Sequence, residues 1–179
     1  MCRIMTSNYK NCKTENGISI SGDRGKGAGF NGSYISELAP KKSFWKIWHD
    51  NIGKISEEEN TRYYISNYYK EVLSKLDPKE VLNLIPDGSI LLCYENNNEF
   101  CHRHIVAFWF ELFLGINSSE VIENPRRETV RRVERPEYLK DILECVIKDN
   151  YPMHNFQTIN EAYEYNRKKS KEKILELIM

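Results

Sequence analysis

A short apolar run at residues 89–94 constrains the fold of this chain more than any other segment. It reads Ser-Ile-Leu-Leu-Cys-Tyr, with the turn residues Pro-Asp-Gly before it and three asparagines, residues 96–98, soon after it. A run of this length between turns is typical of a strand that is covered on both faces. A helix is expected over residues 101–114, because Gly115 can end it. The sequence therefore predicts a strand–turn–helix corner in an α/β domain.

Capping patterns predict where other helices begin. Ser56 precedes Glu59 by three residues, which is a capping box, so a helix is expected from there to about Leu76. Asp77 begins a shorter helix in the same way, since the proline after it is tolerated in a first turn. In the last third of the chain, helices are expected over residues 136–148 and, behind a capping box at Thr158, over residues 159–177.

Strands and loops are expected before residue 40. Residues 18–21 alternate apolar and polar side chains, as a half-buried strand does. Residues 22–32 are rich in glycine and basic residues and indicate a mobile loop. Residues 33–38 predict a short helix that Pro40 stops. With no internal repeat and no low-complexity linker, one domain with a helical C-terminal extension accounts for the pattern.

Charge and apolar content argue against two classes of protein. The 26 basic residues are balanced by 26 acidic residues, so no global field favours nucleic acid or an anionic membrane. The longest strongly apolar run, residues 105–114, is too short to span a bilayer. The five cysteines are an odd number, and no signal-peptide pattern accompanies them. Reduced thiols and a cytoplasmic location are therefore expected.

Five reactive side chains gather at the predicted corner. Cys93 and Glu95 are two residues apart at the end of the strand, so they can project to the same side. Cys101 stands at the start of the helix, where unpaired amides commonly lower the pKa of a thiol. His102 could transfer a proton near neutral pH, and Arg103 offers a planar fork for phosphate or carboxylate. This edge of an α/β sheet is where ligands bind.

Three interpretations of these residues stay open at this point. In the first, a thiolate or Glu95 acts catalytically beside Arg103 on an anionic or glycosidic substrate. In the second, the two cysteines bind zinc with His102 or His104, although the spacing lacks the short cysteine pair of structural zinc sites. In the third, the cysteines are small buried hydrophobes, and the histidine and arginine bond to loop carbonyls.

The corner also carries a family resemblance. Residues 91–115 read LLCYENNNEFCHRHIVAFWFELFLG, an apolar strand ending in Cys-x-Glu, then a short loop and Cys-His-Arg. This closely resembles the signature of the short type of domain-of-unknown-function family 488. Residues 6–10, 18–21 and 30–40 resemble other blocks of that family.

The resemblance implies a fold but no function, because the family is named for lacking one. The fold is a compact Rossmann-like three-layer α/β domain with a small, mainly parallel sheet over residues 1–125. Residues 126–179 would form a helical extension packed on the same domain. Asn8 and Tyr34 within the similar blocks, and Arg24 behind the second block, are candidates for ligand binding together with Arg103.

Three further patterns have a plainer interpretation beside a functional one. Residues 27–32 satisfy G-x-G-x-x-G, but Pro40 leaves no room for a long helix, so a flexible loop is favoured over a dinucleotide site. That loop could fold over the corner and bring Arg24 or Lys26 to an anion. Glutamates stand among the five arginines of residues 126–135, which favours a solvent-exposed face over a site for nucleic-acid phosphates. The tyrosines at 63, 64, 68 and 69 favour core packing on a helix.

These observations predict an enzyme that acts on a small anionic or nucleotide-like ligand. Cys101 or Glu95 would be the nucleophile or base, with Cys93 beside them, and His102 would transfer protons. Arg103 and Arg24 would hold the anion. The alternatives are a non-catalytic module that binds nucleic acid or a protein, and a structural metal site at the corner. The sequence indicates neither a cofactor nor an oligomeric state.

Overall fold

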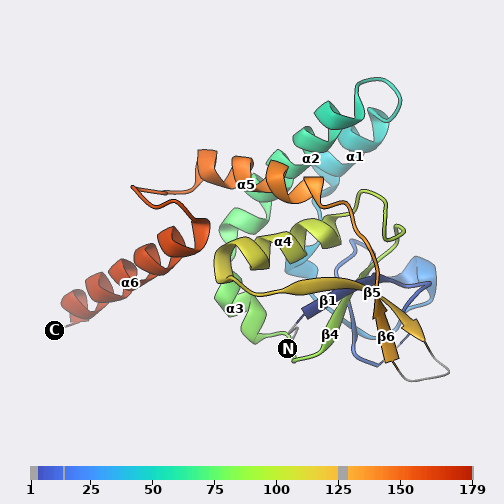
Figure 1. Cartoon of the computed structure of the whole chain (residues 1–179), viewed down its shortest axis with the longest axis horizontal. Coiled ribbons are helices and arrows are strands. Elements are labelled where there is room, and N and C mark those ends of the chain that lie inside the picture. The colour runs from blue at the N-terminus through green and yellow to red at the C-terminus, as the bar shows by residue number, and fades with distance from the viewer. Residues whose placement is uncertain (1–3, 14, 125–128, 179) are drawn as a thin grey trace.

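The computed structural model describes residues 4–13, 15–124 and 129–178. Within them, six strands form one sheet in the order β3-β2-β4-β1-β5-β6. Figure 1 shows β4, β1, β5 and β6 of this sheet beside helix α4. Neighbouring strands from β3 to β5 are parallel, and β6 is antiparallel to β5. The strands are β1 (Ile4–Asn8), β2 (Gly17–Ser19), β3 (Ser33–Tyr34), β4 (Ser89–Cys93), β5 (Ser118–Asn124) and β6 (Thr129–Arg132).

The helices begin close to the residues that the capping patterns indicate. The hydroxyl of Ser56 accepts a hydrogen bond from the main-chain amide of Glu59. The carboxylate of Asp77 accepts hydrogen bonds from two main-chain amides in the next turn, so both predicted caps are confirmed. The α-helices are α1 (Lys42–Asp50), α2 (Glu57–Glu71), α3 (Pro78–Asn83), α4 (His102–Leu114), α5 (Tyr138–Asn150) and α6 (Ile159–Ile178). Short 3-10 helices lie at Lys26–Ala28, Ser36–Leu38 and Leu73–Lys75.

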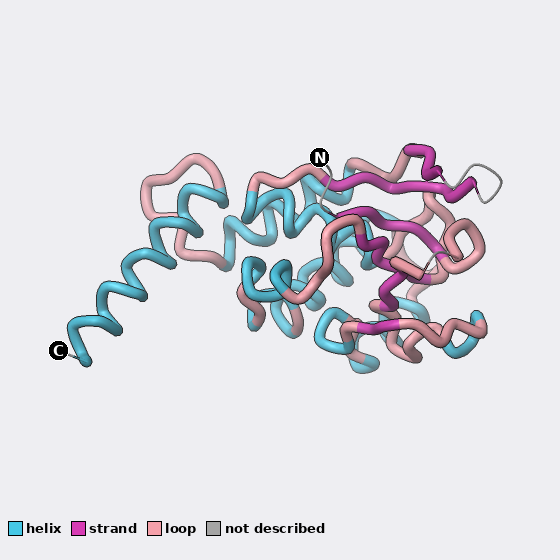
Figure 2. The backbone as a smooth tube through the Cα atoms, turned by 90° about the horizontal axis from the view of Figure 1, so that it is seen from below, coloured by secondary structure: helices cyan, strands magenta, loops and turns pink. Residues whose placement is uncertain are grey.

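Strand β4 is buried along its whole length, as its apolar sequence predicts. Ile90 and Leu92 join a small cluster with Tyr9 and Val121 on one face of the sheet. Leu91 belongs to the main core on the other face, where α4 packs against β1, β4 and β5. Figure 2 shows the strands gathered at one end of the molecule and α6 projecting at the other. The predicted α/β class is confirmed, with a mostly parallel sheet consistent with a Rossmann-like three-layer fold.

The register of the central strands brings distant residues to one edge of the sheet. Asn8 at the end of β1 lies opposite Cys93 at the end of β4. Thr6 lies opposite Glu120 on β5. Because these strands are parallel, their carboxyl ends meet at the edge where α/β sheets bind ligands.

The C-terminal helices pack on the body of the domain before the chain leaves it. Helix α5 contacts α2 and α4, and the start of α6 contacts α4. Thr158 and Glu161 form the predicted capping box through two reciprocal hydrogen bonds. The rest of α6 is exposed and extends away from the body (Figure 1). The predicted boundary between residues 125 and 126 lies outside the described residues and stays a prediction.

Residues 33–38 do not form the predicted helix. Ser33–Tyr34 instead pairs with β2 as strand β3, and the amide of Ile35 donates to the carbonyl of Ser19 at 2.9 Å. Pairing along the open edge of β2 outweighs the weak local preference for a helix, and one 3-10 turn, Ser36–Leu38, remains. Over the ranges that the structure describes, no helix is long and apolar enough to cross a membrane.

Candidate functional site

The predicted corner forms where β4 ends and α4 begins. Cys93 is the last residue of β4 and faces α4, on the same side of the strand as Leu91. Cys101 has extended backbone geometry as the N-cap residue of α4, and His102 is the first helical residue. The turn between them carries Glu95. Four of the predicted site residues therefore lie together because they are close in sequence.

Asn8 supports this turn from the neighbouring strand. Its Nδ2 donates to the carbonyl oxygen of Glu95 at 3.1 Å. Its Oδ1 accepts the amides of Lys10 and Asn11. Asn8 is 1% exposed and uses both ends of its amide inside the fold, so it holds the turn that carries Glu95.

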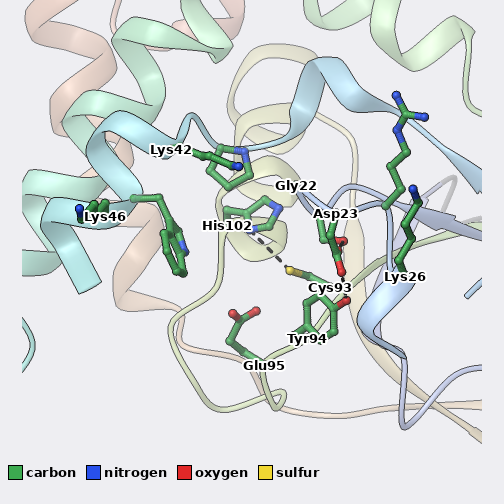
Figure 3. Close-up of a pocket in the computed structure, with 13 residues that line it drawn as sticks. Gly22, Asp23, Lys26, Lys42, Lys46, Cys93, Tyr94, Glu95 and His102 are labelled. Atoms are coloured by element: carbon green, nitrogen blue, oxygen red, sulfur yellow. Dashed lines mark hydrogen bonds between the residues drawn. The ribbon is translucent and has the colours of Figure 1, made fainter. Parts of the chain in front are cut away.

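The imidazole of His102 lies against both thiols of the corner. Its Nδ1 is 3.6 Å from Sγ of Cys93 (Figure 3). The same nitrogen is 3.9 Å from Sγ of Cys101. Its Nε2 is 2.9 Å from the carbonyl oxygen of Ile20. Because a carbonyl can only accept, Nε2 carries a proton, and Nδ1 is the nitrogen that exchanges one with the sulfur atoms.

The surroundings shift the pKa values of the two thiols in opposite directions. Burial raises the pKa of Cys93, and the hydrogen bond and charge of Cys101 add to this. Burial also opposes ionisation of Cys101, but the hydrogen bond of Cys93 and the charges of Arg103 and His102 hold its pKa well below the usual range. Burial acts against protonation of His102, yet the charge of Cys101 raises its pKa. The cluster favours a Cys101 thiolate beside a protonated His102.

Glu95 connects this cluster to the surface. Its Oε2 is 2.8 Å from Sγ of Cys101, so the two groups share a hydrogen bond. Burial, followed by the charge of Cys101 and this hydrogen bond, raises the pKa of Glu95 to about 7. A carboxyl group in this range can take up or release a proton near neutral pH.

The same cluster could hold a metal ion. The ligand atoms of Cys93, Cys101 and His102 all lie within 4.8 Å of one another. Zinc prefers sulfur and imidazole ligands, and three protein ligands leave a fourth position open. Both cysteines would have to bind as thiolates, however, and burial raises the pKa of Cys93.

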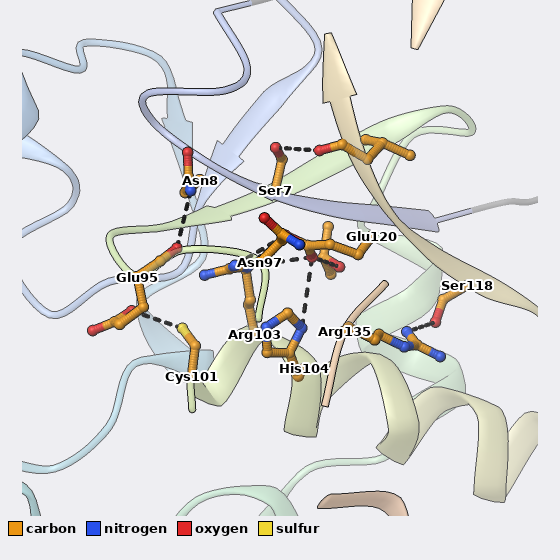
Figure 4. A network of polar contacts seen from close by, with 12 residues as sticks. Ser7, Asn8, Glu95, Asn97, Cys101, Arg103, His104, Ser118, Glu120 and Arg135 are labelled. Atoms are coloured by element: carbon orange, nitrogen blue, oxygen red, sulfur yellow. Dashed lines mark hydrogen bonds and ion pairs between the residues drawn. The ribbon is translucent and has the colours of Figure 1, made fainter. Parts of the chain in front are cut away.

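Arg103 is fully buried and binds a carboxylate of its own chain (Figure 4). Its Nη2 is 2.9 Å from Oε1 of Glu120 and donates to the carbonyl of Asn96 at 3.0 Å. The hydroxyl of Thr6 donates to the second oxygen of Glu120. Glu120 thus occupies the position that the sequence analysis assigned to an anionic ligand, and Arg103 holds the loop and α4 to the sheet.

His104 completes this buried network without adding a charge. Its Nδ1 is 3.6 Å from Oε2 of Glu120. Burial, and then the charge of Arg103, lower the pKa of His104 to about 3, so it is neutral at physiological pH. The charge of Glu120 is therefore balanced by Arg103.

A pocket of about 930 Å³ opens over the corner (Figure 3). Cys93, Glu95 and His102 form part of its wall, whereas Cys101 and Arg103 do not line it. The volume is in the range of small-molecule sites. The remaining lining residues come from the loop after β2, from α1 and its approach, and from the corner: Ser21, Gly22, Asp23, Arg24, Lys26, Pro40, Lys42, Trp45, Lys46 and Tyr94.

The glycine-rich loop lines the pocket together with the corner, an arrangement that the sequence analysis gave as a possibility beside a flexible loop. Asp23 orders it by accepting the amides of Gly25 and Gly27 and the hydroxyls of Ser21 and Tyr94. The G-x-G-x-x-G segment leads into strand β3 and not into a long helix. The loop therefore lacks the helix N-terminus that binds a dinucleotide.

Two of the expected ligand-binding residues lie on this side of the pocket. Arg24 lines the pocket and has a φ of 62°. Its guanidinium lies over the ring of Tyr34, 4.0 Å from the centroid. Tyr34 does not line the pocket, so it supports Arg24 from outside.

Replacing Gly25 by alanine is expected to lower the Tm more than replacing Gly29. Both glycines have positive φ, 76° and 71°, so alanine costs about 1–2 kcal/mol of backbone strain at either position. At Gly25 the added Cβ would also lie 2.8 Å from Phe30 and from the ring of Tyr9, whereas nothing lies within 4 Å at Gly29. Thermal unfolding of both variants measures the difference. Equal losses would contradict the close approach at Gly25.

The described arginines of residues 126–135 lie in different environments, some exposed and one with a mostly buried side chain. Its first two arginines lie outside the described residues. Arg131 and Arg132 are exposed on β6. Arg135 has a side chain only 7% exposed, with Nη2 2.8 Å from Oε1 of Glu111. The last arginine of the cluster is thus part of the packed domain.

Sequence reasoning missed the wall of the pocket that α1 provides. Lys42, Trp45 and Lys46 line the pocket from this helix. Their spacing of three and four residues places them on one helical face, and that spacing was a signal that could have found them. Glu120 was also missed, because nothing near it in sequence marks it as the partner of Arg103.

Comparisons with known proteins bear on the segment that builds this site. A family model, DUF488-N3a, described as the active DUF488-N3 subclade, matches residues 4–112. The match runs from β1 into α4 and so includes the loop, α1 and the corner. Searches of curated proteins and of solved structures found no match. Because the model covers more than half of the chain, the protein belongs to the DUF488-N3a family.

Proposed function

We propose that this protein is an enzyme that binds a small anionic or nucleotide-like ligand in the pocket and uses Glu95 as a general base. The observation that carries the proposal is a carboxyl group in the wall of a pocket lined by four cations, Arg24, Lys26, Lys42 and Lys46. No ion pair joins any of these cations to a carboxylate of the described residues. A negatively charged ligand would complement them.

The other candidate residues support Glu95 in this proposal. Cys101 lies behind Glu95, with Sγ 2.8 Å from Oε2, and outside the pocket lining, so, beside the larger effect of burial, its charge and hydrogen bond raise the pKa of the base without contact with the ligand. His102 and Cys93 line the pocket next to Glu95 and can pass protons between Nδ1 and the sulfur atoms. Arg24 contributes to binding of the anion. The description of the matching subclade as active agrees with a catalytic role.

A turnover screen tests the proposal. The full chain is incubated with nucleoside phosphates, sugar phosphates and carboxylic acids, and mass spectrometry follows each compound while thermal shift reports binding. At least one phosphorylated compound is expected to raise the Tm and to be consumed. If no anionic compound is consumed, the proposal is wrong, whether or not a compound raises the Tm.

A second candidate function is metal binding by Cys93, Cys101 and His102, which the 4.8 Å limit on their separations favours. An ion held by these three residues would keep a position open for water or substrate. Elemental analysis of protein purified without added metal decides this case. About one zinc ion per chain that is lost in Cys93→Ser supports a metal site, and metal-free wild-type protein removes it.

A further inference from the structure

The cations of the pocket form two pairs on different walls. Lys42 and Lys46, the helix pair, stand on α1 one turn apart on the same face. Arg24 and Lys26, the loop pair, stand on the loop that follows β2. Figure 3 shows Lys46 and Lys26 on opposite sides of His102. The positive charge therefore flanks the reactive corner from two directions.

The two positive charges of the helix pair repel each other when no ligand is bound. Like charges four residues apart on a helix repel each other, and neither lysine has an ion-pair partner among the described residues. An anion between the two lysines would remove this repulsion. The placement therefore suits a phosphate group near the N-terminal half of α1.

Trp45 stands between these lysines and lines the same pocket. It is 42% exposed, although burying its indole ring would stabilise the fold. The ring stacks on His49, with 5.2 Å between the ring centroids and 26° between the planes. A partly exposed aromatic ring beside cations is the arrangement that binds a nucleobase by stacking.

The loop pair shares its wall of the pocket with the carboxylate of Asp23, so this wall carries two positive charges and one negative charge. The neighbouring carboxylate, Asp23, is already occupied by the amides of Gly25 and Gly27 and by the hydroxyl of Tyr94. Its oxygens hold the loop in shape and make no ion pair with Arg24 or Lys26. This wall can therefore accept a second negative group.

We propose that the pocket takes a nucleotide with phosphate groups at both ends, its base on Trp45, one phosphate at the helix pair and the other at the loop pair. The inference rests on the proposed function for its location and names the class of substrate. A nucleoside 3′,5′-bisphosphate and a nucleotide within a short strand share this chemistry. A pocket of about 930 Å³ has room for one such unit.

Calorimetric titration of the full chain tests the arrangement of charge. Nucleoside 3′,5′-bisphosphates of all four bases are compared with the matching 5′-diphosphates, which carry two phosphates at one end. The bisphosphate is expected to bind roughly tenfold more tightly for at least one base, since one additional charge-assisted contact is worth about a factor of ten. Equal or tighter binding of every 5′-diphosphate overturns the inference.

Variants assign the two phosphates to the two walls. Lys42→Gln with Lys46→Gln, and Arg24→Gln with Lys26→Gln, are each expected to weaken binding of the bisphosphate about tenfold. Trp45→Ala is expected to weaken it by a factor of about five or more. The exposed Lys54→Gln is the control and should leave affinity unchanged. If only one of the two double variants binds the bisphosphate more weakly than the wild type does, the inference is also overturned.

Two further titrations separate the possible sources and the two proposals. A trinucleotide that binds more tightly than the bisphosphate identifies a strand as the source, and weaker binding identifies a free nucleotide. The bisphosphate is also titrated into Glu95→Gln. If this variant binds as the wild type does while the wild type turns over no compound, the proposed function fails and the nucleotide site stands.

Discussion

Replacing Glu95 by glutamine is expected to lower kcat about 100- to 10,000-fold, the range that a positioned general base contributes. The amide has nearly the same shape but cannot take a proton. The main-chain carbonyl of residue 95 still accepts a hydrogen bond from Asn8, and the side chain stays beside Cys101. The measurement is kcat for the compound identified by the turnover screen. Glu99→Gln, an exposed change in the same loop, is the control and should stay within about twofold of wild type.

The pH dependence of this reaction follows from the pKa of Glu95. Burial and the charge of Cys101 raise that pKa to about 7, so Glu95 is protonated at lower pH and cannot act as a base there. For the wild type, kcat/KM is expected to rise about tenfold per pH unit below 7 and to level off above it. Glu95→Gln should lack this limb. A variant with the same limb, or with more than a tenth of wild-type kcat, would contradict the role of Glu95.

Replacing Glu120 by glutamine is expected to lower the free energy of unfolding by about 3–5 kcal/mol. The change removes the carboxylate that lies 2.9 Å from the buried guanidinium of Arg103, and the nearby His104 is neutral and cannot replace its charge. The loss is a large part of the stability of an ordinary domain. Urea unfolding, read as a shift of the midpoint, measures it.

Two comparisons isolate the buried charge. Glu58→Gln removes an exposed partner 3.7 Å from Arg62, so it should cost less than about 1 kcal/mol. Arg103→Met combined with Glu120→Met removes both buried charges and should be more stable than Glu120→Gln alone. A loss below about 1 kcal/mol for Glu120→Gln would show that Arg103 finds compensation elsewhere.

The parts of the fold that depend on neighbouring residues could be predicted from the sequence. The corner spans ten residues from Cys93 to His102, so strand and helix signals alone bring its side chains together. The caps at Ser56, Asp77 and Thr158 are equally local, because each side chain bonds to an amide two or three residues ahead. The strand, helix and capping patterns of the sequence are therefore sufficient to predict the corner and these three helix caps.

The parts that depend on distant partners could not be predicted. Strand β5 reads Ser-Ser-Glu-Val-Ile-Glu-Asn, which looks like an exposed segment, yet Ser118 and Glu120 are buried. They are buried because Arg135 and Arg103 bond to them from other elements. Arg103 itself looked like an anion-binding residue until the fold supplied Glu120. Long-range polar pairing leaves no periodic trace in a sequence.

The hydrogen bond between His102 and the carbonyl of Ile20 has a consequence for engineering the site. A main-chain carbonyl is present whatever side chain stands at residue 20. The proton on Nε2 is therefore independent of the amino acid encoded there, and core packing at that position can be redesigned while Nε2 keeps its proton. Changes that shift the end of β2, not changes of chemistry at position 20, are the way to alter it.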